Sequence, residues 1–175
     1  MLSSFMKQVN LVELEAKHIE LLRSWRNNAA TSQFLSAPAV NISSTNQEKW
    51  FKRISLDSSE HHYIIAVQGS LVGHASIGIR ELDGVKFGQP SLLIGSLDWQ
   101  KSPVPVMALV KLMQCAFVDL ELNLLRSPVH KLNIDAIDLY RAAGFRIIDS
   151  EEENFFLTNA SKDEFEKSLL QSDLL

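Results

Sequence analysis

The sequence predicts one α/β domain, of the α+β type, in which helices cover both faces of a mixed sheet. The chain has 175 residues, 46% of them apolar, which is enough for one domain with a full core. Strand-like and helix-like segments follow the order β, α, α, β, β, β, α, β, α, β, β, α, and a mixed sheet with helices on both faces satisfies that order. No linker or internal repeat divides the chain, so we expect a single domain over residues 1–175.

The first half of the chain is expected to form a strand, two helices and a hairpin. The patterns cover a strand at 8–15, helices at 18–28 and 44–54, and strands at 63–68 and 71–80. A polar stretch at 31–44 indicates a loop between the two helices. Ser44 or Thr45 is the expected cap of the second helix. Gly69-Ser70 is a good hairpin turn.

The second half is expected to alternate strands and helices. The expected elements are a strand that ends in 91–97, a helix at 105–120, a strand at 124–130, a helix from 133, strands at 145–148 and 154–158, and an amphipathic helix at 161–170. Asp83-Gly84 marks a turn before the first of these strands. Gly144 suits the position after a helix, where φ is positive, so the helix from Asn133 ends there and a strand follows.

Composition and charge restrict the function. The formal net charge is −4, whereas a general nucleic-acid binder carries a basic excess, so no nucleic-acid partner is expected. No apolar run is long enough to span a bilayer, and no secretory signal is evident, so no membrane association is expected. Cys115 is the single cysteine and cannot form an internal disulfide, which is consistent with a reducing compartment. We expect a cytoplasmic protein.

The segment 133–145 carries the most specific pattern in the chain. It reads N-x-x-A-x-x-L-Y-x-x-x-G-F, and it resembles the last motif of the GCN5-related N-acetyltransferases (GNAT), which move an acyl group from coenzyme A to an amine. The resemblance implies the GNAT fold: a twisted, mostly antiparallel sheet in which the strands at 91–97 and 124–130 are parallel and splay apart. It also implies acetyl-CoA or another acyl-CoA as co-substrate, and no metal.

The same motif implies roles for two side chains. In the family the tyrosine at the position of Tyr140 often protonates the departing thiolate, a task within reach of a phenol, and the asparagine at the position of Asn133 lies near the pantetheine arm. The open alternatives are a core tyrosine, and an asparagine that only caps its helix.

A second family signature, Q/R-x-x-G-x-G/A, holds the pyrophosphate of coenzyme A on free N–H groups at a helix N-terminus. It aligns here with Q-K-S-P-V-P at 100–105, so proline replaces both glycines and two N–H donors are missing. The resemblance still assigns the donor site to residues that keep an N–H group or a polar side chain, namely Leu97, Gln100, Lys101, Ser102, Val104 and Val106. A backbone N–H near Leu97 would stabilise the oxyanion. The alternative is a donor site that is lost or repurposed.

The acceptor side is less clearly marked. The segment Trp25-Arg26-Asn27 resembles the acceptor-side helix of the ribosomal-protein and amino-sugar branches of the family. His130 is a candidate to take the proton of the incoming amine, and His74 is a candidate acceptor contact. For both histidines the alternative is a buried, hydrogen-bonded side chain, and for Trp25 it is a core position.

The sequence therefore predicts an acyl-CoA-dependent N-acyltransferase for a small-molecule amine, preferably a nucleotide-linked amino sugar. One alternative is a protein N-terminal acetyltransferase of the ribosomal-protein type. Another is a non-catalytic binding module with this fold, which the Pro103/Pro105 pair suggests. A homodimer is one assembly to consider.

Overall fold

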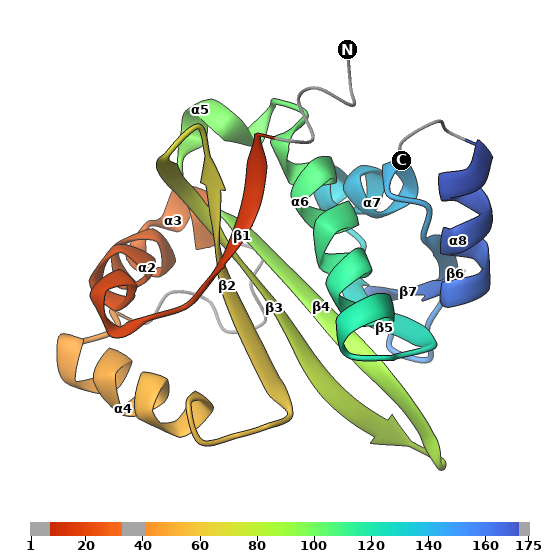
Figure 1. Cartoon of the computed structure of the whole chain (residues 1–175), viewed down its shortest axis with the longest axis horizontal. Helices are drawn as coiled ribbons and strands as arrows, with labels where there is room; N and C mark the ends of the chain where they lie inside the picture. The colour runs from red at the N-terminus through yellow and green to blue at the C-terminus, as the bar shows by residue number, and fades with distance from the viewer. Residues whose placement is uncertain (1–7, 33–40, 172–175) are drawn as a thin grey trace.

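A seven-stranded mixed sheet forms the centre of the protein (Figure 1). The computed structural model describes residues 8–32 and 41–171. The strands are β1 (Val9–Glu13), β2 (Glu60–Val67), β3 (Ser70–Leu82), β4 (Val85–Ile94), β5 (Leu124–His130), β6 (Arg146–Asp149) and β7 (Phe155–Ser161). They lie in the order β1-β2-β3-β4-β5-β7-β6, and neighbours are antiparallel except for β4 and β5. The predicted sheet with one parallel pair is confirmed.

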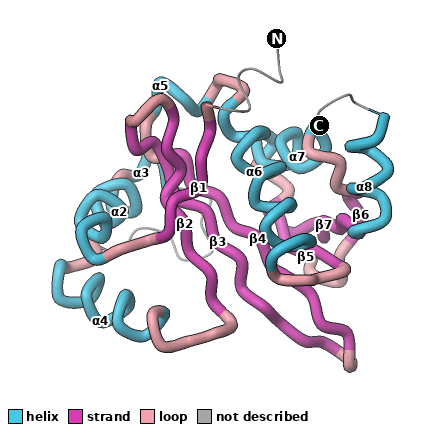
Figure 2. The backbone as a smooth tube through the Cα atoms, in the orientation of Figure 1, coloured by secondary structure: helices cyan, strands magenta, loops and turns pink. Residues whose placement is uncertain are grey.

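Helices cover both faces of this sheet, as predicted (Figures 1 and 2). The described helices are η1 (Ala16–His18), α2 (Ile19–Asn27), α3 (Ala29–Ser32), α4 (Ser44–Ile54), α5 (Leu97–Gln100), α6 (Val104–Gln114), the π-helical turn η2 (Cys115–Asp119), α7 (Ile134–Ala142) and α8 (Lys162–Gln171). Within the described ranges, no helix combines the length and the apolar character that a bilayer span requires.

The buried apolar residues divide the sheet into two faces. On one face, residues of α2 and α4 such as Leu22 and Ile54 pack against Ile64 on β2 and Leu93 on β4. On the other face, a larger cluster joins α6, α7 and α8 to the sheet. Successive residues of a strand point to opposite faces, so β2 and β4 contribute to both clusters. We call these the α2/α4 face and the α6/α7 face.

The end of β4 lies earlier than the sequence indicates. The N–H groups of Gly95 and Ser96 both donate to the carbonyl of Val72, at 2.9 and 3.1 Å. Two successive donors on one acceptor turn the chain out of the strand, so β4 ends at Ile94 instead of residue 97. Leu97, expected in the strand, begins α5.

The start of α4 also differs from the expectation. Its N-cap is Ser43, whose hydroxyl accepts a hydrogen bond from the Asn46 N–H at 3.2 Å, so neither Ser44 nor Thr45 caps the helix. The loop expected at 31–44 falls mostly on residues 33–40, which lie outside the described residues.

Among the described residues, the parallel strands β4 and β5 pair at one position, Gly88 with Leu125. A Cβ at Gly88 would lie 2.7 Å from the Leu125 side chain and 2.8 Å from Leu122, so only glycine permits this approach. Beyond this pair the strands run apart toward Ile94 and His130. We call this opening the β4–β5 gap, and the predicted divergence of the two strands is confirmed.

Two prolines account for the gap. The antiparallel registers make odd-numbered residues of β4 bond to β3 and odd-numbered residues of β5 bond to β7. Even-numbered residues of both strands therefore direct their backbone groups into the gap. After the pair Gly88–Leu125, the next two bonds of a parallel ladder would need backbone N–H donors at positions 90 and 128. Both positions are proline, which has no N–H. The strands part where the sequence removes both donors.

Candidate functional site

The α7 helix is fixed at both ends by its sequence motif. Asn133 is the N-cap, and its Oδ1 accepts a hydrogen bond from the Ala136 N–H at 3.1 Å. Gly144 has φ of +92°, and the next N–H, of Phe145, donates to the Tyr140 carbonyl at 2.9 Å. Asn133 therefore caps the helix, while its predicted contact with pantetheine stays a prediction.

Tyr140 is buried between α7 and β5, beside the gap. Its side chain is 9% exposed and packs edge-on against Phe145. Burial raises the pKa of Tyr140, and a hydrogen bond with the Ser127 hydroxyl only partly offsets this. The Ser127 Oγ donates to the Pro90 carbonyl at 3.2 Å, across the gap. The site thus holds a neutral phenol, a proton donor, at the edge of the gap.

The predicted donor loop offers few free N–H groups. The N–H groups of Lys101 and Ser102 both donate to the Trp99 carbonyl, and that of Val104 donates to the Ser102 hydroxyl at 3.2 Å. Val104 is also fully buried. Among the N–H groups of Lys101, Ser102, Val104 and Val106, that of Val106 alone makes no such bond within the described chain. The turn before α6 closes on itself and uses the other three, and the assignment of the donor site to this loop stays a prediction.

Leu97 and Gln100 lie at the open end of β4. Leu97 is 53% exposed in α5. Gln100 donates from Nε2 to the Ile94 carbonyl at 3.0 Å, so it holds the end of the strand. In the β4 register, the N–H groups of Leu92 and Ile94 face the gap. They are better placed than Leu97 to meet a carbonyl oxygen there.

Trp25 and Asn27 hold the structure together at the end of α2. Trp25 is 8% exposed, and its indole lies so close to Gly95 that a Cβ there would be 2.1 Å from the ring. Asn27 accepts the Ile42 N–H at 2.8 Å and donates to the Ile42 carbonyl at 3.0 Å. Trp25 is thus used in packing and Asn27 in bonds to the backbone, and their role as acceptor contacts stays a prediction.

Arg26 differs from its two neighbours. Its guanidinium lies 5.7 Å from the centre of the Trp50 ring, and burial lowers its pKa. No carboxylate forms an ion pair with it in the described part of the chain. A half-buried cation without an anionic partner remains a candidate for an acceptor contact.

His74 belongs to a cluster on the α2/α4 face. Its Nε2 lies 3.1 Å from Nδ1 of His62, and the two rings are stacked. Trp50 packs edge-on against both rings. Nε2 of His62 lies 3.4 Å from Oε2 of Glu60. We call Glu60, His62, His74 and Trp50 the histidine cluster. The described residues contain no group of side chains placed to hold a metal.

Both histidines of the cluster are held neutral. Burial lowers the pKa of His74 to about 3, helped by the nearby His62 and Arg26. Burial also lowers the pKa of His62, although Glu60 opposes this. Two neutral imidazoles in direct contact can pass a proton from one ring to the next.

His130 lies at the end of β5, on the face opposite the core residue Val129. Its Nδ1 accepts a hydrogen bond from the Leu132 N–H at 3.1 Å, and its ring packs against Phe155. A neutral imidazole has one lone pair, and this bond occupies it. The predicted role of His130 as proton acceptor stays a prediction.

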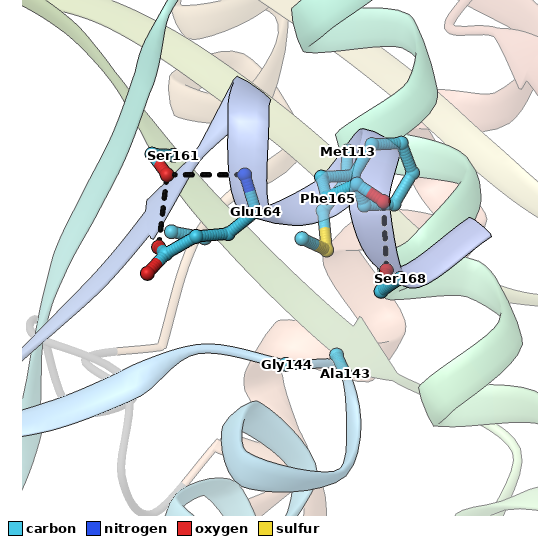
Figure 3. Close-up of a pocket in the computed structure, with 8 residues that line it drawn as sticks. Met113, Ala143, Gly144, Ser161, Glu164, Phe165 and Ser168 are labelled. Atoms are coloured by element: carbon cyan, nitrogen blue, oxygen red, sulfur yellow. Dashed lines mark hydrogen bonds between the residues drawn. The ribbon is translucent and has the colours of Figure 1, made fainter. Parts of the chain in front are cut away.

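A small pocket lies away from these residues, where α8 approaches the end of α7 (Figure 3). Met113, Gly144 and Phe165 are among the residues that line it, and the Ser161 hydroxyl is hydrogen-bonded to the Glu164 carboxylate at its edge. None of the predicted site residues lines this pocket, so it is separate from the candidate site.

Three residues that the structure brings into the site were missed in the sequence. Ser127 is a polar residue among core-facing positions of β5, between Leu125 and Val129, and this alternation was the available signal. His62 and Glu60 had no such signal, because their approach to His74 depends on an irregular strand register.

Comparison with known proteins agrees with the predicted fold. A family model described as an acetyltransferase (GNAT) domain matches residues 8–146. In sequence, the chain is similar to the acetyltransferase PseH of Campylobacter jejuni, with 22% identity over 151 residues that cover 86% of this chain and 91% of PseH. The crystal structure of PseH in complex with acetyl coenzyme A is similar with a TM-score of 0.67, at 20% identity over 88% of this chain and 99% of that one.

Two other solved structures are also similar. AAC(6')-Ib in complex with ribostamycin and coenzyme A gives a TM-score of 0.80 at 16% identity, over 92% of this chain and 97% of that one. Spermidine N-acetyltransferase from Vibrio cholerae, in complex with CoA and spermine, gives a TM-score of 0.78 at 16% identity, over 91% and 98% of the two chains. At this identity, the likeness establishes a shared fold.

Proposed function

Because this chain belongs to the acetyltransferase (GNAT) family, we propose that it transfers an acetyl or short acyl group from coenzyme A to the primary amine of an amino sugar. The family and the enzyme class expected from the sequence are confirmed. The acyl donor is acetyl-CoA or another acyl-CoA, and CoA or acetyl-CoA is bound in several of the similar structures. The identity of the acceptor is the part of this proposal that the family match does not provide.

The observation that carries the proposal is the β4–β5 gap with Tyr140 at its edge. The gap exposes backbone groups of β4, among them the N–H groups of Leu92 and Ile94. We assign the thioester to this gap, where one of these N–H groups would stabilise the oxyanion. Tyr140 would then protonate the leaving thiolate, since its buried phenol is neutral and lies beside the gap.

Lys101 and the N–H of Val106 are the groups of the donor loop that we assign to the pyrophosphate. Lys101 is exposed and forms no ion pair within the described residues, whereas most loop N–H groups are already bonded. A cation therefore compensates for the donors that Pro103 and Pro105 lack. Ser102 would add its hydroxyl only by giving up its bond to Trp99.

Arg26 supports a nucleotide-linked amino sugar as the acceptor. A half-buried guanidinium without a carboxylate partner attracts phosphate and repels a polyamine or a polycationic aminoglycoside. A sugar that carries both an amine and a nucleotide diphosphate would bring phosphate charge to the face that contains Arg26.

A panel of acceptors tests this proposal. The chain is incubated with acetyl-CoA and, in turn, a UDP-linked amino sugar, kanamycin, spermine and a short peptide with a free N-terminus, and thiol release is measured. We expect the UDP-linked sugar to react fastest, and Arg26→Gln to raise its KM by about tenfold, the effect of one charge-assisted contact. Faster reaction of the peptide would favour the protein N-terminal acetyltransferase instead.

A non-catalytic binding module remains the alternative of another class. The donor loop supports it, because Pro103 and Pro105 remove two donors and the turn consumes others. Absence of thiol release with every acceptor would favour this alternative. The cytoplasmic location and a homodimer remain further parts of the proposal, the former supported by the lone Cys115.

A further inference from the structure

We propose that His74, His62 and Glu60 form a proton relay on the α2/α4 face that accepts the proton released by the attacking amine. The inference rests on the acetyl transfer proposed above, in which an ammonium or its adduct must lose a proton for the amide to form. β4 contains no Asp or Glu that could do this, and the Nδ1 lone pair of His130 is occupied by the Leu132 N–H.

The three side chains form a continuous line across neighbouring strands. His74 on β3 contacts His62 on β2 through Nε2 and Nδ1, 3.1 Å apart. The other nitrogen of His62, Nε2, is buried and makes no hydrogen bond within the described residues, and it lies 3.4 Å from Oε2 of Glu60, within ion-pair distance. The far oxygen of Glu60, Oε1, accepts a hydrogen bond from Arg80 at 2.7 Å. The line therefore runs from a buried imidazole to a carboxylate that is anchored by a cation.

The carboxylate determines which nitrogen of each ring carries the proton. Glu60 is an acceptor, so it favours the proton of His62 on Nε2. Nδ1 of His62 then has the lone pair and accepts from His74, whose proton must lie on Nε2. Nδ1 of His74 is left with a free lone pair. The charge of Glu60 and the hydrogen bond between the two rings thus prepare one end of the relay as a base.

The free nitrogen of His74, Nδ1, is not fully enclosed, although the residue is buried at 9% exposure. It has no hydrogen-bond partner in residues 8–32 and 41–171, and it is not among the fully buried polar atoms of that part of the chain. Directly opposite His74, on β4, lies Leu93, which is flanked by the gap-facing residues Leu92 and Ile94. An amine that attacks a thioester in the gap from the α2/α4 face would therefore approach His74.

The proton movement balances at each atom. An N–H bond of the amine breaks as Nδ1–H of His74 forms. At the same time Nε2–H of His74 breaks as Nδ1–H of His62 forms. The positive charge then lies on His62, beside Glu60. The proton that Tyr140 gives to the thiolate is restored from solvent. After the amide leaves, His62 returns its Nδ1 proton to Nε2 of His74, and Nδ1 of His74 releases its proton to solvent, so the sum is amine plus thioester giving amide plus thiol.

The surrounding charges explain why the proton would move on to His62. The charged and titratable groups that act on the two rings are Arg26 on α2, Arg53 on α4, Glu60 on β2 and, from the opposite face of β2, His61. Arg26 and His62 disfavour charge on His74, and Glu60 is the group that favours charge on His62. Trp50 shields both rings at their edges. Charge is thus more stable at the Glu60 end than at the open end.

The tautomers of the two rings test the relay without any substrate. Long-range 1H–15N spectra of the 15N-labelled full chain at pH 7 distinguish Nε2–H from Nδ1–H in neutral imidazole. We expect Nε2–H in both His62 and His74. An Nδ1–H tautomer in either ring would place a proton where the relay needs a lone pair, and would overturn the proposal.

The variant His62→Gln tests the relay during turnover. The probe is the acceptor, among those of the panel above, that the wild-type chain acetylates. Glutamine can still accept from His74 but cannot take up a proton. We expect kcat to fall by about tenfold or more, within the range of general base effects. The KM for the acceptor should stay within about twofold of the wild-type value, and the acid limb of the pH profile of kcat should shift. His61→Gln is the matched control, because His61 lies on the opposite face of β2.

The outcomes separate the relay from the proposed function. If the wild type is active and His62→Gln is as fast, with an unchanged pH profile, the relay is wrong and acetyl transfer stands. An equal loss in His61→Gln would also contradict it, since the effect would then come from the strand. If no acceptor is acetylated, acetyl transfer fails and the relay fails with it.

Discussion

The hydroxyl of Ser127 on β5 donates to the carbonyl of Pro90 on β4, and this 3.2 Å bond crosses the β4–β5 gap. In a regular parallel ladder the same carbonyl would accept from the backbone of residue 128, but Pro128 has no N–H. Ser127 replaces that donor with a side chain and is also hydrogen-bonded to Tyr140. One residue therefore links the opening of the sheet to the proposed proton donor.

Tyr140→Phe should lower kcat by at least about tenfold, because it removes the phenolic proton while keeping the ring against Phe145. The cost in folding stability should be about 1 kcal/mol, the loss of the bond to Ser127. Single-turnover kinetics with acetyl-CoA and urea unfolding measure the two effects. Unchanged turnover would remove Tyr140 from the chemistry and leave it as a packing residue.

Pro90→Ala combined with Pro128→Ala should partly close the gap. The two substitutions restore the donors of the next two ladder bonds, so we expect slower amide hydrogen exchange at residues 90 and 128. Acetyl-CoA should bind more weakly, since its place between the strands would be partly occupied by hydrogen bonds. Fast exchange at both new amides, with unchanged affinity, would show that the prolines do not hold the strands apart.

Lys101→Ala should weaken acyl-CoA binding by about 1–2 kcal/mol, the scale of one charge-assisted bond, and make the binding less sensitive to salt. The reason is that the turn before α6 uses the N–H groups of Ser102 and Val104 for itself. Titration calorimetry at two salt concentrations measures both effects. Lys111→Ala, in the last turn of α6, is the control. Equal affinity and salt dependence for Lys101→Ala and wild type would place the pyrophosphate elsewhere.

The free energy of unfolding should fall as the pH drops below 6.5. The folded protein lowers the pKa of His74 from 6.5 to about 3. In that interval the unfolded chain takes up a proton that the folded ring does not, so stability is complete above pH 6.5 and declines toward pH 3, by up to about 1.4 kcal/mol per pH unit. Urea unfolding at pH 7, 6 and 5 measures the slope. His74→Gln should have a shallower slope, and parallel slopes would contradict a neutral, buried His74.

The overall fold could be predicted because its signals are local. The order of the elements, the cap formed by Asn133 and the positive φ of Gly144 follow from the adjacent sequence. The divergence of β4 and β5 was expected from the family resemblance, and Pro90 and Pro128 supply its physical reason. Tyr140 was found because it lies within the most specific motif.

The histidine cluster could not be predicted, because it depends on a strand irregularity. A regular hairpin through Gly69-Ser70 would place His62 and His74 on opposite faces of the sheet. The turn instead uses Gln68 and Gly69, both with positive φ, and the register between β2 and β3 shifts at Ile65. The shift brings both histidines to the α2/α4 face. A change of one residue in register reverses the face of every side chain that follows.

The contacts of the donor loop were likewise beyond the sequence. The N–H of Ser102 was expected to be free, but whether a loop N–H faces a ligand or bonds within its own turn depends on the path of three or four residues. Here the Trp99 carbonyl turns back to accept from both Lys101 and Ser102. The order of residue types in the sequence does not determine this backbone path.

Titration calorimetry of the full chain with acetyl-CoA tests the central claim most directly, since every step of the proposed mechanism begins with an acyl donor in the β4–β5 gap. We expect saturable binding in the micromolar range, despite proline at both glycine positions of the donor loop. No detectable binding at millimolar acetyl-CoA would contradict the account and favour a binding module that has kept the fold without the donor.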